Sequence, residues 1–182
     1  MGVMEGGWDV SRVEENFEIL KKLGDGVVPP PGSESDRPFS RFMAIYASLC
    51  RHHMKTFGTT QRQIAAVAAK NHQHSVHNPY SQFRKPFTID EVLAAPPISY
   101  PLTLPMCSAM SDGAAAAIVC SEEGLQRIGA DRARAVRVAA SVVRSFTLRS
   151  MDEPQRHATH LAAQAAYAQA GLGPEDMDVA EV

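Results

Sequence analysis

The chain has 182 residues, of which 45% are hydrophobic and 21% are charged, and its formal net charge at pH 7 is -2. This length supports one or two hydrophobic cores, and the balanced charge excludes a strongly basic partner-binding surface, so we expect neither nucleic acid nor a membrane surface as partner. Three widely spaced cysteines, a start unlike a signal peptide and the lack of a long apolar run predict a cytoplasmic protein without a membrane span.

The first half of the chain has the pattern of helices separated by loops. Helical spacing of apolar residues predicts a helix over residues 10–23, and a loop rich in glycine and proline follows over residues 24–37. A second helix is predicted over residues 38–56, and Gly58 ends it. The face of this helix that we expect to be buried comprises Phe42, Ile45, Tyr46, Leu49 and His53.

Two capping boxes mark the starts of the next two helices. Thr60 lies three residues before Gln63, and Thr88 lies three residues before Glu91. In this spacing the hydroxyl and the longer side chain each satisfy an amide at the start of a helix. We therefore predict helices over residues 61–74 and 89–95, the first ended by Asn78-Pro79 and the second by Pro96-Pro97.

The second half of the chain alternates between two kinds of pattern. Short apolar runs predict strands over residues 114–120, 135–143 and 177–182. Between them, Ser121 is placed to cap a helix over residues 122–128 with Gly129 after its end, and a helix over residues 157–170 stops at Gly171. Alternating strands and helices are typical of an α/β parallel sheet, and the last strand meets the chain end, which suggests a truncated chain.

Two segments resemble a known family. The run KNHQHSVHNPYSQF, residues 70–83, and the run SAMSDGAAA, residues 108–116, are similar to segments of the thiolase superfamily, of the sterol carrier protein X (lipid-transfer-protein) type. Residues 88–94 and 171–179 fit the same family. The resemblance covers about residues 41–182, whereas the first forty residues match only loosely, mainly at residues 2–5.

The resemblance implies an α/β fold, in which a helical loop domain is followed by parts of the two α/β halves of a thiolase-like protein. Residues 1–105 would form the mostly helical loop domain of the N-terminal half. Residues 106–132 would form the last strand and helix of that half, and residues 133–182 the start of a truncated C-terminal half. The family's nucleophilic cysteine would lie before Met1, and its active-site histidines and last cysteine would lie after Val182. No catalytic residue is therefore assigned to this chain.

The resemblance also implies a function. The chain would be the acyl-CoA-binding portion of a thiolase-type acyltransferase, which performs 3-ketoacyl-CoA thiolysis or Claisen condensation in lipid or steroid side-chain metabolism. Coenzyme A would be a substrate, with no cofactor, and the full-length protein a homodimer or tetramer. Two alternatives stay open: a thiolase-like retro-aldol lyase acting on steroid side-chain CoA esters with a small partner subunit, and a non-catalytic lipid- or acyl-CoA-binding module.

Two residues are candidates for binding coenzyme A. By resemblance, Ser108 matches a serine that hydrogen-bonds a pantetheine amide, while its alternative role is to cap a turn before Asp112-Gly113. Met43 lies roughly where the family lines the pantetheine tunnel, while its alternative role is that of a core methionine.

The remaining reactive side chains have structural interpretations. His72, His74 and His77 are close in sequence, but on a helix residues 72 and 74 point about 160° apart, so helix-end and loop hydrogen bonds are favoured over a metal site. Cys107 and Cys120 are expected to be small buried side chains rather than nucleophiles, with Cys107 a candidate pocket residue.

Overall fold

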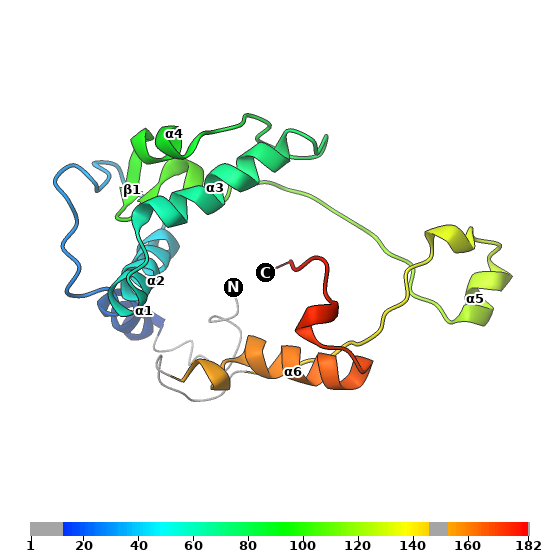
Figure 1. The fold of residues 1–182 in the computed structure, drawn as a ribbon. Coiled ribbons are helices and arrows are strands. Elements are labelled where there is room, and N and C mark those ends of the chain that lie inside the picture. Colours follow the sequence, from blue (N-terminus) through cyan, green and yellow to red (C-terminus); the bar gives the residue numbers. More distant parts are fainter. Residues whose placement is uncertain (1–12, 146–152, 182) are drawn as a thin grey trace. The chain divides into compact units, whose positions relative to one another are not determined.

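The computed structural model describes residues 13–145 and 153–181 (Figure 1). The contacts divide the chain after Ala114 into two compact units. Each unit is described by itself. No helix in the described ranges is both long and apolar enough to cross a membrane.

The first unit is built mainly from helices and ends in a small hairpin. Strand β1 pairs with β2 in antiparallel register, with Pro97 opposite Thr103 and Ser99 opposite Leu102. The elements in chain order are α1 (Val13–Lys22), α2 (Arg41–Phe57), α3 (Gln61–Ser75), α4 (Ile89–Ala94), β1 (Pro97–Ser99), β2 (Leu102–Thr103) and the short 3₁₀ helix η3 (Leu104–Met106).

A buried serine joins α1 to α2. The Ser48 hydroxyl lies 2.9 and 2.7 Å from the carbonyl oxygens of Leu20 and Lys21, and it accepts a hydrogen bond of 2.8 Å from the Gly24 amide. The carbonyls near the end of α1 thus have a partner other than water. A side chain at Gly24 would lie 2.9 Å from the Ser48 carbonyl oxygen, so only glycine permits this close approach.

The core beneath the candidate site lies between α3 and α4. Ala65, Ala69 and Val92 are buried, and the small alanines of α3 let α4 pack closely. The side chains of Phe87, Ile89, Leu93 and Met106 surround them. Met106 belongs to η3, so this core also fixes the segment that leads to Ser108.

Both capping boxes are confirmed. Thr60 Oγ1 accepts from the Gln63 amide (3.3 Å), and the Thr60 amide donates to Gln63 Oε1 (2.8 Å). At α4, Thr88 Oγ1 accepts from the Glu91 amide (3.2 Å), and the Thr88 amide donates to Glu91 Oε2 (2.7 Å). These local bonds satisfy amides that have no partner within their helix.

The buried face of α2 differs from the prediction. Ile45 is buried as expected, but Phe42, Tyr46 and His53 are exposed, and Ala47 and Ser48 are buried instead. Helix α2 contacts α1 both through the Ser48 hydrogen bonds and through the Phe17 and Phe42 rings, whose centroids are 5.8 Å apart, and it also contacts β1. Gly58 follows α2 with φ of 71°, as expected of a helix-ending glycine.

The second unit contains the two other helices that the sequence predicted. Helix α5 (Glu122–Arg127) begins after Ser121, whose hydroxyl accepts from the Gly124 amide, and α6 (Ala158–Ala170) ends at Gly171 with φ of 69°. Three short 3₁₀ helices complete the described part: η4 (Arg132–Arg134), η5 (Pro154–Arg156) and η6 (Pro174–Asp176).

The strands predicted over residues 114–120, 135–143 and 177–182 are not formed in the described residues, and Val182 lies outside them. Within the described residues no strand pairs with these segments, and several of their apolar side chains are exposed, for example 86% for Val119 and 90% for Val136. A strand needs a partner for its backbone groups, which these segments lack. The described fold is therefore rich in helix and has one two-stranded sheet. This fold is compatible with a thiolase-like fragment. The predicted α/β sheet and the predicted domain boundaries stay predictions. The predicted start of the first helix, residues 10–12, also lies outside the described residues.

Candidate functional site

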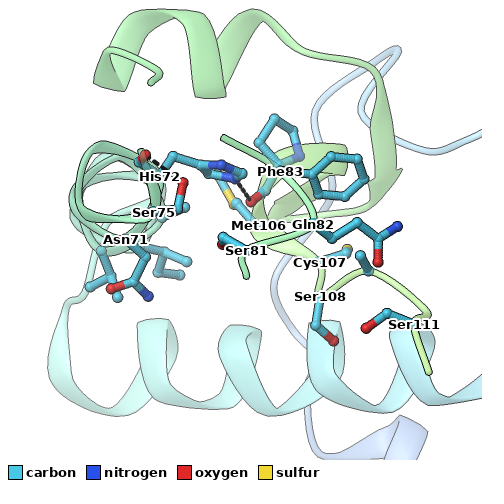
Figure 2. Close-up of a pocket in the computed structure, with 15 residues that line it drawn as sticks. Asn71, His72, Ser75, Ser81, Gln82, Phe83, Met106, Cys107, Ser108 and Ser111 are labelled. Carbon is cyan, nitrogen blue, oxygen red and sulfur yellow. Dashed lines mark hydrogen bonds between the residues drawn. The ribbon is translucent and has the colours of Figure 1, made fainter. Parts of the chain in front are cut away.

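A pocket of about 520 Å³ lies within the first unit (Figure 2). Three segments form its walls: one face of α3, the loop over residues 81–83, and the stretch from η3 to Ser111. Parts of the two family-like runs, residues 70–83 and 108–116, thus line one cavity, together with residues 64, 67, 68 and 105–107 outside them. The side chains that define its polar character are Asn71, His72, Ser75, Ser81, Gln82, Cys107, Ser108 and Ser111.

The α3 wall is held in place by the end of the helix. The Ser75 hydroxyl donates to the His72 carbonyl oxygen (2.8 Å), as serine does one turn along a helix. The His72 ring stands edge-on to the Phe87 ring, with centroids 4.9 Å apart, and its Nε2 lies 2.9 Å from the Pro105 carbonyl oxygen. His72 therefore joins α3 to the opposite wall of the pocket, as Figure 2 shows.

The loop wall is formed by a turn after α3. The Tyr80 amide donates to Asn78 Oδ1 (3.0 Å), and the Ser81 amide donates to the Asn78 carbonyl oxygen (3.1 Å). An asparagine side chain that accepts a hydrogen bond from the amide two residues later favours a tight turn. The turn brings Ser81, Gln82 and Phe83 to the pocket.

The third wall follows the β hairpin. The buried Thr103 hydroxyl donates to the Val92 carbonyl oxygen (2.6 Å), and the Leu104 amide donates to the Pro96 carbonyl oxygen (2.9 Å). The Cys107 amide then donates to the Leu104 carbonyl oxygen (3.1 Å). Beyond this bond the chain continues to Ser108, whose exposed side chain lines the pocket.

The titratable side chains in the pocket lining are those of His72 and Cys107. Its lining side chains include hydroxyls and amides but no aspartate, glutamate, lysine or arginine. Apolar contact surface comes from Ile64, Val67, Phe83 and Met106. A cavity of this kind suits a ligand segment with amides and short apolar stretches rather than a phosphate or a carboxylate.

The two half-buried thiols of the first unit are not activated nucleophiles. Burial raises the pKa of Cys107 above its ordinary value of 9.0, and burial is also the largest cause of the raised pKa of Cys50. A nucleophilic cysteine requires a lowered pKa, so the environment of Cys107 opposes the reactive thiolate. Cys107 lines the pocket, whereas Cys120, expected to be buried, is exposed because the strand in which it was placed does not form.

The two residues proposed from the sequence lie in different places. Ser108 lines the pocket, and within the described residues its hydroxyl has no hydrogen-bond partner, so the turn cap that was its alternative role is not formed. Met43 lies on α2, is half-buried and is not among the lining residues. Their roles in binding coenzyme A stay predictions.

Sequence reasoning assigned no role to several pocket residues. Asn71, Gln82 and Phe83 were seen only as part of a motif, although they supply two amides and an aromatic ring. The residues of the α3 wall could have been identified from the sequence because they share one face of the helix and combine apolar with polar side chains. They lie at positions 64, 67, 68, 71, 72 and 75. His53 Nδ1 lies 2.8 Å from Thr59 Oγ1, and its ring packs against Phe57. In the described ranges no three metal-ligating side chains converge.

Comparisons with known proteins identify relatives along most of the chain. Sterol carrier protein 2 of Rattus norvegicus is 38% identical over 185 residues, covering 98% of this chain. Benzoylsuccinyl-CoA thiolase subunit BbsB of Thauera aromatica is 36% identical over 139 residues, covering 75% of this chain. Acetyl-CoA acetyltransferase of Methanothermobacter thermautotrophicus is 34% identical over 171 residues, covering 90% of this chain. The chain spans 33%, 36% and 44% of the lengths of these relatives. No protein-family model matches the chain.

Proposed function

Because this chain belongs to the thiolase superfamily, of the sterol carrier protein type, we propose that it supplies the acyl-CoA-binding portion of a thiolase-type acyltransferase. The reaction would be thiolysis of a 3-ketoacyl-CoA or the reverse Claisen condensation. Coenzyme A would enter as a substrate. The groups that perform acyl transfer would belong to the rest of the protein, and a full-length homodimer or tetramer is part of this proposal.

One observation carries the proposal: residues from both family-like runs, 70–83 and 108–116, line a single pocket that holds no carboxylate, lysine or arginine side chain. The pantetheine arm of coenzyme A is uncharged and contains two amides linked by short carbon chains. Hydroxyls and side-chain amides can hydrogen-bond such amides, while Ile64, Phe83 and Met106 offer apolar contact. A volume of about 520 Å³ lies in the range of small-molecule sites.

Within this pocket Ser108 is assigned the contact with a pantetheine amide. Its hydroxyl is exposed and lacks a partner among the described residues, so a ligand would not have to displace an existing protein hydrogen bond. Cys107 is assigned a place in the binding wall rather than in catalysis, because burial raises the pKa of its thiol.

The two alternative functions, a retro-aldol lyase and a non-catalytic binding module, would use the same pocket. A retro-aldol lyase acting on steroid side-chain CoA esters would require a partner subunit, and a non-catalytic module would bind lipid or acyl-CoA without turnover. Neither requires a thiolate in this chain. The raised pKa of Cys107 is compatible with both. Binding of coenzyme A or its esters is common to the acyltransferase and the lyase, whereas the module would bind either a lipid or an acyl-CoA.

The experiment is a calorimetric titration of the chain with coenzyme A, comparing the wild type with Ser108→Ala. Loss of one neutral hydrogen bond should raise Kd roughly 2- to 13-fold. Ser33→Ala is the matched control: it removes a serine hydroxyl in the same unit that bonds the Pro30 carbonyl oxygen outside the pocket, and Kd should not change.

Two results would count against the assignment. If wild-type protein binds no coenzyme A, the proposed function fails. If Ser108→Ala lowers the melting temperature while Kd stays the same, Ser108 has a structural role instead of a binding role.

A further inference from the structure

We propose that His72 is a positioning residue that fixes the Ser108 segment against α3 and so sets the geometry of the pocket. This inference rests on the proposed function in one respect, namely that Ser108 contacts the ligand. The tether itself is a property of the unliganded chain, so it can be tested separately.

The geometry of His72 fits such a role. Its Nε2 lies 2.9 Å from the Pro105 carbonyl oxygen, three residues before Ser108. A carbonyl oxygen can only accept, so Nε2 carries the proton and donates. The side chain is half-buried, and edge-on packing against the Phe87 ring, with centroids 4.9 Å apart, fixes the plane of the imidazole.

His72 is one of three side chains that hold the third wall near Ser108: Met106 packs against the α3–α4 core, and Cys107 Sγ lies 3.7 Å from the Thr103 carbonyl oxygen. Upstream, the hairpin is secured by the bonds from Thr103 to Val92 and from Leu104 to Pro96. The last backbone bond is that of the Cys107 amide to the Leu104 carbonyl oxygen. Over residues 108–114, all of them described, the chain makes no hydrogen bond. The direction in which Ser108 leaves η3 is therefore set by the contacts of residues 105–107, to which α3 contributes the hydrogen bond from His72.

Two substitutions separate the hydrogen bond from the packing of the ring. His72→Phe keeps an aromatic ring beside Phe87 but removes the donor. His72→Gln removes the ring but places an amide NH₂ near the position of Nε2, so it can donate to the Pro105 carbonyl oxygen. If the hydrogen bond positions the segment, glutamine should preserve the function that phenylalanine loses.

The first measurement is amide hydrogen exchange in the chain without ligand. In His72→Phe, the Cys107 amide should exchange roughly 2- to 13-fold faster than in the wild type, because opening of η3 no longer breaks the His72 bond. The Val92 amide, which donates to the Thr88 carbonyl oxygen, reports on the α3–α4 core and should not change. His72→Gln should restore the wild-type rate at Cys107.

The second measurement is calorimetric titration with coenzyme A. His72→Phe should weaken binding, and His72→Gln should retain it. If the Cys107 and Val92 amides accelerate together, or if neither accelerates, His72 does not position the segment. Faster exchange at Cys107 with unchanged affinity of His72→Phe would also overturn the proposal. If wild-type protein binds no coenzyme A, the proposed function fails, while the exchange rates still decide whether the tether exists.

Discussion

At the scale of single residues, Cys107 shows why position in a pocket and reactivity are separate properties. It lies beside Ser108 in the wall of the cavity, yet burial raises the pKa of its thiol. Neither a cationic group nor a general base is among the causes that set this pKa. The same reasoning applies to Cys50, where burial outweighs the opposing effect of Arg51. These two thiols are therefore suited to packing and not to acyl transfer.

This environment predicts an order of reaction with iodoacetamide. At neutral pH, Cys120 should be alkylated first because its side chain is exposed, and Cys107 and Cys50 should react more slowly because burial limits access and raises the pKa of each thiol. Mass spectrometry of peptides taken over time gives the three rates. Coenzyme A should slow the reaction at Cys107 and leave Cys120 unchanged. A rate at Cys107 equal to or above that at Cys120 would indicate an activated thiol and contradict its place in the binding wall.

At the scale of elements, the helices were predictable because their signals are local. Thr60 with Gln63 and Thr88 with Glu91 determine where α3 and α4 begin, and both boxes form as expected. The strands predicted at residues 114–120 and 135–143 depend instead on partners that are distant in sequence, and an apolar run alone does not supply them. The β1–β2 hairpin was missed because strands of three and two residues are too short to show a periodic pattern.

In the candidate site, too, local features were predictable from the sequence and contacts between distant residues were not. Resemblance identified Ser108 and both motif segments, but it gave no indication that these segments would face each other across a cavity. That arrangement depends on His72 reaching Pro105 and on Met106 packing against the α3–α4 core, which are contacts between distant positions.

The two capping boxes predict different responses to acid. The pKa of Glu91 lies below its ordinary value of 4.5 because the Thr88 amide and hydroxyl both hydrogen-bond its carboxylate. A lowered pKa in the folded state stabilises the protein above the pKa of the unfolded state, and this contribution is lost as pH falls through the folded pKa. Gln63, at the equivalent place in the α3 box, does not titrate. The start of α4 should therefore weaken below about pH 4.5, whereas the start of α3 should not.

Glu91→Gln tests this difference, because glutamine can keep the capping box without a titrating group. Denaturant unfolding at a series of pH values gives the free energy of unfolding of the wild type and of the variant. The difference between them should be largest near neutral pH and should shrink as pH falls below 4.5. A difference that stays constant over the whole acid range would show that the capping bonds do not lower the pKa of Glu91.

At the scale of the whole molecule, every lining residue of the pocket belongs to the unit that ends at Ala114. The described residues of the other unit, 115–145 and 153–181, form helices α5 and α6 and are not among the lining residues. The chain spans about a third of the sterol carrier protein relative, 33% of its length. Binding of the pantetheine arm is thus a property that this chain can be expected to show by itself, whereas acyl transfer belongs to the proposal for the whole protein.

The most direct test of the central claim is a titration of the ¹⁵N-labelled chain with coenzyme A, followed by the chemical shifts of its backbone amides. The largest changes should occur on the three walls of the pocket, at Asn71 and His72, at Gln82 and Phe83, and at Cys107 and Ser108. Smaller changes should follow in the α3–α4 core, and the amides of α6 should not shift. Changes confined to residues 115–181, or no change at millimolar coenzyme A, would contradict the claim that this pocket binds the acyl-CoA substrate.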